Sequence, residues 1–270
     1  TQGFTGAELE NLLNEAALLA ARAERKAITE KDIEEATLKV IAGPEKKSRL
    51  VTEKDNEVTA YHEAGHAVAA YNLPTQDKVH QVTIIQRGMA AGLTVTRPDS
   101  DDQHVSRNQM RENIIMLLGG RCAEEIFLDD ICTGASNDIE RATNIARSMV
   151  TKYGFSSKLG TVVYGSENDE VFIGKDYGHT KNYSEKIAAQ IDEEVKSIIE
   201  KAYEDCKNIL LQNTEKMHLL AKYLLKFEKI DGADFEKLMK GEISEDIFND
   251  NENVNQIIMT SNEDSPAPET

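Results

Sequence analysis

Hydrophobic residues recur at every third or fourth position over most of this chain, which is the period of an amphipathic helix. The first such stretch begins at a capping box, Thr5 to Glu8, and continues with a broad apolar stripe that we expect to be buried. The members of that stripe are Leu9, Leu12, Leu13, Ala16, Ala17, Leu19 and Ala20. The same criteria predict further helices over 29–42, 53–72, 106–127, 136–153, 183–213, 215–227 and 232–240.

Short stretches between these helices have the composition of strands. Residues 79–85 and 93–96 are rich in β-branched side chains and are joined through glycine-containing turns. Residues 161–164 and 171–173 are two further short strand candidates. The chain is therefore predicted to be predominantly α-helical with a small β-sheet.

Two adjacent glycines, Gly119 and Gly120, lie inside the predicted helix over 106–127. Glycine weakens a helix, so a pair of glycines there indicates that another backbone must approach closely. Gly65 also weakens its helix, the one over 53–72, and it likewise indicates that another backbone approaches there.

Charge and composition exclude some classes of protein. The chain has 48 acidic and 31 basic residues and a net charge of −17, which argues against nucleic-acid binding because phosphate contacts need clustered Lys and Arg. Cys122, Cys132 and Cys206 lack paired spacing and are interpreted as buried thiols in a reducing compartment. No apolar run approaches the roughly 20 residues that span a bilayer, and we expect no signal peptide.

The strongest chemical pattern is His62-Glu63-Ala64-Gly65-His66, an H-E-x-x-H motif on a helix. Its spacing puts both imidazoles on one helix face, where they can reach one metal ion, and Glu63 can take a proton from water bound there. Two ordinary histidines are the alternative, but unpaired imidazoles would be costly on so apolar a helix. A catalytic zinc site needs three protein ligands and one open position.

The third ligand has to come from elsewhere in the chain. Asp138 lies in the first turn of its helix and on the inward stripe, although a first-turn acid is also common as a partner of the helix dipole. Glu124 and Glu125 are alternatives, with a hydrogen bond to a ligating imidazole or an ion pair with Arg121 as their other roles. The remaining candidates are the histidines His80, His104, His179 and His218.

Several motifs in register resemble one family. Thr59 to Ala67, Gly119 to Glu125, Thr133 to Ile139 and Met149 to Gly154 are similar to the peptidase domain of the FtsH family, the membrane-anchored, ATP-dependent zinc proteases. Gly3 to Ala17 resembles the start of the helical lid of that family's AAA+ ATPase module. The resemblance covers about residues 1–241.

This resemblance implies a site and an assembly. It implies one zinc per chain held by His62, His66 and Asp138, with Glu63 as the catalytic base, in a zincin-type peptidase. It also implies a homo-hexamer that receives protein substrates by ATP-driven threading at the cytoplasmic face of the bacterial membrane. The membrane anchors and the ATP- and Mg-binding core belong to a longer parent, of which we expect this chain to be a soluble piece.

Physical reasoning favours the same third ligand. The carboxylate of Asp138 is short and rigidly placed, and an anionic oxygen suits a doubly positive ion that is held by two neutral imidazoles. Glu124 and Glu125 are then expected to orient a ligating imidazole through its second nitrogen.

We expect three parts: residues 1–45 as the lid fragment, 46–241 as the zinc metallopeptidase domain and 242–270 as a disordered tail. The tail has eight acidic residues and neither Lys nor Arg. The expected function is zinc-dependent hydrolysis of peptide bonds, with strand 79–85 or 93–96 pairing with extended substrate.

The sequence has two alternative interpretations, a catalytically silent assembly module and a free-standing zinc peptidase. Glu63 argues against the first, because a structural zinc site has no use for an unligated carboxylate. The lid helices argue against the second.

Overall fold

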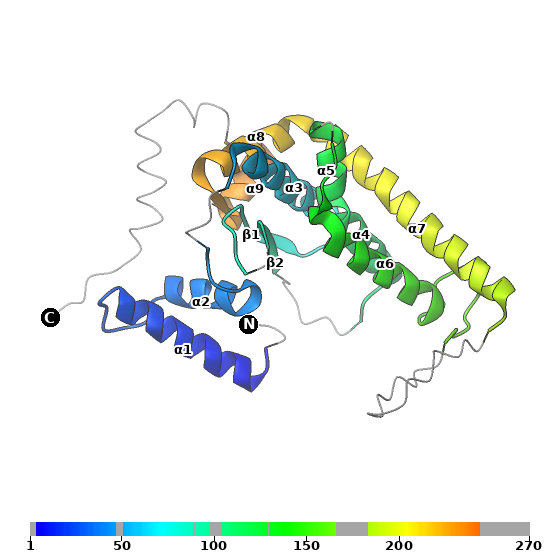
Figure 1. The fold of residues 1–270 in the computed structure, drawn as a ribbon, viewed down its shortest axis with the longest axis horizontal. Coiled ribbons are helices and arrows are strands. Elements are labelled where there is room, and N and C mark those ends of the chain that lie inside the picture. The colour runs from blue at the N-terminus through cyan, green and yellow to red at the C-terminus, as the bar shows by residue number, and fades with distance from the viewer. Residues whose placement is uncertain are drawn as a thin grey trace.

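The computed structural model describes residues 4–46, 51–88, 90–97, 104–128, 130–165 and 183–243. The elements are α1 (Gly6–Arg22), α2 (Glu30–Ala42), α3 (Glu53–Asn72), β1 (Lys78–Thr83), β2 (Leu93–Arg97), α4 (Arg107–Leu117), α5 (Gly119–Phe127), η1 (Thr133–Ala135), α6 (Ser136–Thr151), α7 (Glu185–Gln212), α8 (Thr214–Phe227), β3 (Lys229–Asp231) and α9 (Gly232–Lys240). The expectation of a mainly helical fold with a small sheet is confirmed (Figure 1).

The strands of the structure differ from the predicted strands in two places. The strand predicted over 161–164 is wrong: the amide of Tyr164 donates a hydrogen bond to the carbonyl of Thr151, so this segment packs against the end of α6 and not in the sheet. Strand β3 was not predicted, because its three residues are too few to show an alternating pattern. The candidate over 171–173 and the tail from residue 244 onward lie outside the described residues.

Helices α1 and α2 pack against each other at one end of the molecule (Figure 1). Their small core contains Leu12, Ala16 and Ala36. The buried face of α1 is narrower than the predicted stripe, because two of the predicted residues, Leu9 and Leu13, are 39% and 54% exposed. Only one narrow face of α1 has a partner in the described part of the chain.

One arginine joins this helix pair to the rest of the protein. Arg87 follows β1 and is 3% exposed, and its guanidinium donates to both carboxylate oxygens of Glu35 on α2 at 2.9 and 2.8 Å. It also donates to Glu45 at 2.6 Å. A buried guanidinium needs such partners, so this network holds α2 against the segment that follows β1.

The sheet has the order β2-β1-β3, and both pairings are antiparallel. Val82 of β1 lies opposite Thr94 of β2 and Ile230 of β3. Strand β1 is therefore central and hydrogen-bonded along both edges, and β2 is an edge strand. Helices α3 and α9 contact β1.

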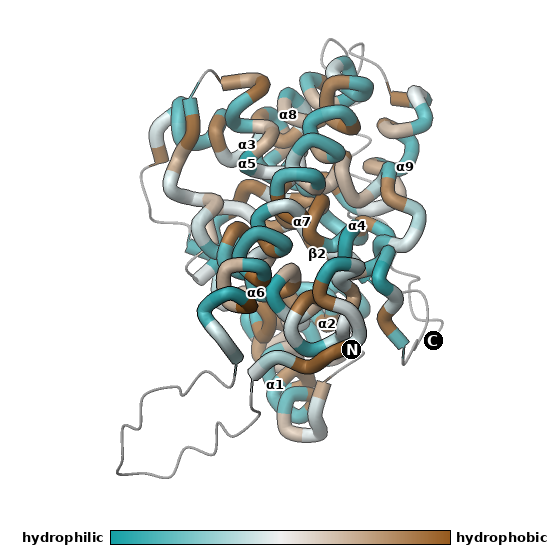
Figure 2. Tube along the Cα trace, turned by 90° about the vertical axis from the view of Figure 1, so that its right-hand side faces the viewer, coloured by the Kyte–Doolittle hydropathy of each residue, from teal (hydrophilic) through white to brown (hydrophobic). Residues whose placement is uncertain are grey.

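Helix α3 is the centre of the main core. Its residues from Ala60 to Ala70 include a run of small side chains that are buried against α5 and α8. The buried residues of α7 recur at helical spacing, and Figure 2 shows hydrophilic colour over much of its remaining surface. No helix in the described ranges is both long enough and apolar enough to cross a membrane.

The helix predicted over 106–127 is in fact two helices, α4 and α5, which are separated at Leu118. The break lets the start of α5 cross α3 at very short range. A Cβ on Gly65 would lie 2.3 Å from the carbonyl oxygen of Gly119, and a Cβ on Gly119 would lie 2.6 Å from that of Gly65. Both distances are impossible for a real Cβ, so the crossing requires glycine on both helices. This agrees with the close approach predicted from the sequence.

We predict that Gly119→Ala lowers the free energy of unfolding by about 1–3 kcal/mol, because the added methyl group must push α5 away from α3. Gly6→Ala is the control, since a Cβ at Gly6 has no neighbour within 4 Å. Urea denaturation measures both. Equal stability of Gly119→Ala and the parent protein would show that the crossing tolerates a side chain.

Candidate metal centre

Two histidines on α3 present the same ring nitrogen to one point. His62 and His66 are four residues apart, and their Nε2 atoms lie 3.1 Å from each other. Both rings are largely buried, with side chains 13% and 10% exposed. The sequence prediction that one helix face presents both imidazoles is confirmed.

Asp138, in the first turn of α6, reaches the same point from another direction. Its Oδ2 atom lies 3.5 Å from Nε2 of His62 and 3.6 Å from Nε2 of His66. Ligands placed tetrahedrally at 2.0–2.2 Å from zinc would be roughly 3.3–3.6 Å apart. Both distances to Asp138 match this spacing, and the 3.1 Å between the two Nε2 atoms is slightly shorter. The three atoms are therefore close enough to share one zinc ion, with one coordination position left over.

The second nitrogen of each ring is anchored by an acceptor. Nδ1 of His66 lies 2.8 Å from the carbonyl oxygen of Met116, and Nδ1 of His62 lies 2.7 Å from Oε1 of Glu124. A carbonyl or carboxylate oxygen can only accept, so both Nδ1 atoms carry the proton. In the neutral rings Nε2 then presents its lone pair to the cluster, as a metal ligand must.

Glu124 also ties the loop before α6 to this site. It is 1% exposed, and its Oε2 atom accepts a hydrogen bond from the amide of Cys132 at 2.8 Å. The expectation for Glu125 was wrong, because Glu125 faces α7, where it accepts from Tyr203 and from Lys207 at 2.6 Å. Successive helix residues point about 100° apart, so only one of the two can face His62.

The charges of the cluster are mutually dependent. Burial acts to lower the pKa of His62, but hydrogen bonds to Asp138 and Glu124 outweigh burial and raise the pKa to about 9. Burial also opposes ionisation of Asp138, yet both imidazoles hold the pKa of that carboxyl well below its usual range. Without a metal ion, the two carboxylates therefore favour a protonated His62, and a cation in the cluster would replace that proton.

Small residues allow the rings to pack this closely. A Cβ on Gly120 would lie within 2.5 Å of three atoms of the His62 ring. Gly119 and Gly120 thus have separate roles, the first against the backbone of α3 and the second beneath a ring.

Glu63 lies beside the cluster without belonging to it. Its side chain is 7% exposed, and Oε2 accepts a hydrogen bond from the hydroxyl of Thr94 at 2.7 Å. The three clustered residues are His62, His66 and Asp138, so the carboxylate of Glu63 remains available for other chemistry.

Comparison with known protein families shows which family this chain belongs to. The model of Peptidase family M41 matches residues 49–238, and that of the AAA+ lid domain matches residues 1–35. The chain belongs to peptidase family M41.

Curated relatives agree with this assignment. The chain is 56% identical over 242 residues to the ATP-dependent zinc metalloprotease FtsH 1 of Thermoanaerobacter sp., covering 90% of this chain and 40% of that protein. It is 47% identical over 269 residues to the ATP-dependent zinc metalloprotease FtsH of Bacillus subtilis, covering 98% of this chain and 42% of that protein. The chain thus spans about two fifths of the length of these relatives. Zinc is the metal that their names give.

The other candidate ligands lie elsewhere in this M41 fold. Nδ1 of His218 lies 2.8 Å from the hydroxyl of Tyr61, and neither His218 nor His80 nor His104 is part of the cluster. His179 lies outside the described residues. Among the cysteines, Cys122 and Cys206 are buried as expected, but Cys132 is exposed, because it belongs to the surface loop that leads to Asp138.

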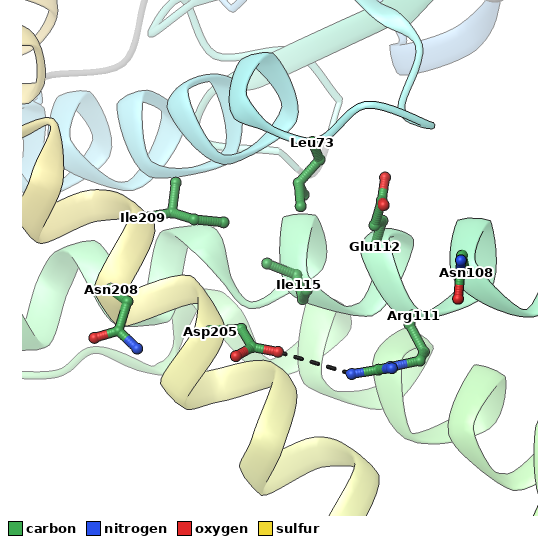
Figure 3. Close-up of a pocket in the computed structure, with 8 residues that line it drawn as sticks. All are labelled: Leu73, Asn108, Arg111, Glu112, Ile115, Asp205, Asn208 and Ile209. Atoms are coloured by element: carbon green, nitrogen blue, oxygen red, sulfur yellow. Dashed lines mark ion pairs between the residues drawn. The ribbon is translucent and has the colours of Figure 1, made fainter.

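A separate pocket of about 350 Å³ lies between α4 and α7, near the end of α3. Figure 3 shows Leu73, Ile115 and Ile209 on its apolar side, and Arg111 pairs with Asp205 at 3.9 Å. None of its lining residues is in the metal cluster. Its charged groups have partners, since Glu112 accepts hydrogen bonds from the amide and the hydroxyl of Thr75.

Sequence reasoning missed two contacts of the site, Met116 and Thr94. Met116 contributes only a backbone carbonyl, for which no residue type is a signal. Thr94 was recognised as part of a strand, but nothing in a single sequence pairs it with Glu63.

We predict that Glu124→Gln weakens zinc affinity about 10–100-fold, because the amide holds the His62 ring less firmly than the carboxylate. Glu125→Gln is the matched control and should leave affinity unchanged. Competition with a chromogenic chelator measures both. A larger loss in Glu125→Gln than in Glu124→Gln would contradict this description of the site.

Proposed function

We propose that this chain is the proteolytic part of a membrane-anchored, ATP-dependent protease for protein quality control. In this role it would be a zinc metalloendopeptidase that hydrolyses peptide bonds in unfolded or threaded proteins. The observation that supports this most strongly is the spacing of His62, His66 and Asp138, with the free carboxylate of Glu63 beside them.

In this proposal His62, His66 and Asp138 hold one zinc ion per chain. Such an ion, when bound, supplies Lewis-acid activation of a water molecule and of the scissile carbonyl. The protein holds the two rings in the required tautomer through Met116 and Glu124, and it holds Asp138 in its ionised form.

Glu63 is proposed as the general base. Its carboxylate would accept a proton from the attacking water and then donate it to the amine that leaves as the peptide bond breaks. Because Glu63 directly follows His62 on α3, the helix fixes the position of its backbone relative to the ligands.

An extended substrate is proposed to pair with β2. Strand β1 has hydrogen-bonded neighbours on both sides, so the earlier suggestion that residues 79–85 could pair with substrate is wrong. The outer edge of β2 has no partner strand in the described part of the chain, and β2 also contacts Glu63 through Thr94. Pairing through the backbone would give little sequence preference.

The larger assembly is also a proposal. We infer that residues 1–45 are a lid fragment, 46–241 the peptidase domain and 242–270 an acidic tail. Membrane anchors and an ATP- and Mg-binding core would be supplied by a longer parent at the cytoplasmic face of a bacterial membrane. The names of the relatives and the match to an AAA+ lid support this.

Homo-hexamer formation is part of the same proposal. Exposed apolar side chains at one end of α6 support self-association, with Tyr153, Val162 and Val163 exposed at 49%, 50% and 64%. The amide of Tyr164, next to Val163, bonds to Thr151 of α6, which holds this segment at the end of that helix.

We predict that Glu63→Gln retains about one zinc per chain and loses hydrolysis of unfolded casein by about 100-fold or more, since a general base contributes roughly 10²–10⁴-fold. Glu57→Gln, at an exposed position six residues earlier on α3, should keep full activity. Zinc content and the release of peptides measure the two effects. A fully active Glu63→Gln protein would show that Glu63 is not the base.

We also predict that the peptidase region sediments as a hexamer at high protein concentration. Deletion of 249–270 should change neither assembly nor hydrolysis, whereas Val163→Asp should shift the protein towards smaller species. A sedimentation profile that shows only monomer at every concentration would refute the proposed assembly of this chain.

A further inference from the structure

The carboxylate of Glu63 is held by a residue of the edge strand. The hydroxyl of Thr94 lies 2.7 Å from Oε2 of Glu63 and 3.2 Å from its backbone carbonyl. A hydroxyl has one proton to donate, and the shorter contact to a charged oxygen is the stronger of the two. The Thr94 proton is therefore directed at the carboxylate.

A second contact confines the same side chain. A Cβ on Gly92 would lie 2.7 Å from Cγ and 2.8 Å from Oε1 of Glu63. The Glu63 side chain thus packs directly on the backbone of Gly92, two residues before Thr94. One oxygen is hydrogen-bonded and the other is packed, so few rotamers remain open.

The strand that carries Thr94 begins directly after Gly92 and is itself well fixed. Thr94 lies opposite Val82 of the central strand, and Val82 is fully buried. Side chains on such strands are placed more accurately than those on loops. The position of the carboxylate is therefore set by the sheet as well as by α3.

We propose that Thr94 is a positioning residue for the general base of the hydrolysis. This inference rests on the proposed role of Glu63. A glutamate side chain has several rotatable bonds, and a base acts only within hydrogen-bond reach of the proton that it takes. By holding Oε2 while Gly92 packs on Oε1, Thr94 fixes the orientation of the whole carboxylate. Strand β2 would then bind substrate along its outer edge and orient the base through a side chain.

The test is the hydrolysis of a short fluorogenic peptide by the zinc-loaded chain, with kcat and KM measured separately. Thr94→Val removes the hydroxyl and keeps the shape of the side chain. We expect kcat to fall about 10–100-fold, in line with the loss of a charge-assisted hydrogen bond, with KM and zinc content unchanged. Thr94→Ser keeps the hydroxyl and should recover most of the loss.

Thr83→Val is the matched control. It removes a buried hydroxyl from the same sheet, one that donates to the carbonyl of Glu228 at 3.1 Å and has no contact with Glu63. We expect Thr83→Val to lower stability and to leave kcat unchanged, which separates damage to the sheet from loss of positioning.

Several results would overturn the proposal. A higher KM with unchanged kcat in Thr94→Val would place Thr94 in substrate binding, and loss of zinc would make its role structural. Equal losses in Thr94→Ser and Thr94→Val would show that the hydroxyl is not the active feature. If Glu63→Gln is inactive while Thr94→Val behaves like the parent, only the role of Thr94 fails; if Glu63→Gln is active, the proposed base fails as well.

Discussion

The backbone contact between α3 and α5 is the constraint on which the site depends. Gly65 and Gly119 leave no room for a side chain at the crossing, and the following residue, Gly120, lies beneath the ring of His62. Because α5 is held this close, Glu124 reaches Nδ1 of the same ring one turn later. The break at Leu118 lets α5 take that direction, which a single straight helix could not do. The close packing of α3 and α5 thus determines the orientation of His62, a proposed metal ligand.

Burial and charge then explain why these particular residues belong together. Glu124 is almost fully buried, and Asp138 and the two imidazoles are largely so. Isolated charges in such a place are costly, so each needs a partner. The Nδ1 protons of the two imidazoles are hydrogen-bonded to Glu124 and to the carbonyl of Met116. The Nε2 lone pairs and the carboxylate of Asp138 point to one place, where a metal ion would fit. The arrangement makes sense as a cation site, and it leaves Glu63 uncommitted.

How much of this could be predicted from the sequence depends on the distance along the chain. His62, Glu63 and His66 followed from helical spacing, and the glycines followed from their cost in a helix. Asp138 needed the family resemblance and a chemical argument, because 72 residues separate it from His66. The choice between Glu124 and Glu125 needed the actual direction of α5. The contact of Thr94 with Glu63 and the strand β3 were not predicted, because a hydroxyl on a strand and a three-residue pairing are not distinctive in a single sequence.

The central claim is that one zinc ion is held by His62, His66 and Asp138. The most direct test is a crystal structure of the zinc-loaded chain with anomalous diffraction recorded on both sides of the zinc absorption edge. This account predicts one strong peak per chain, about 2.0–2.2 Å from Nε2 of both histidines and from a carboxylate oxygen of Asp138. A peak bound by Glu124 in place of Asp138, or no peak between the two rings, would contradict it.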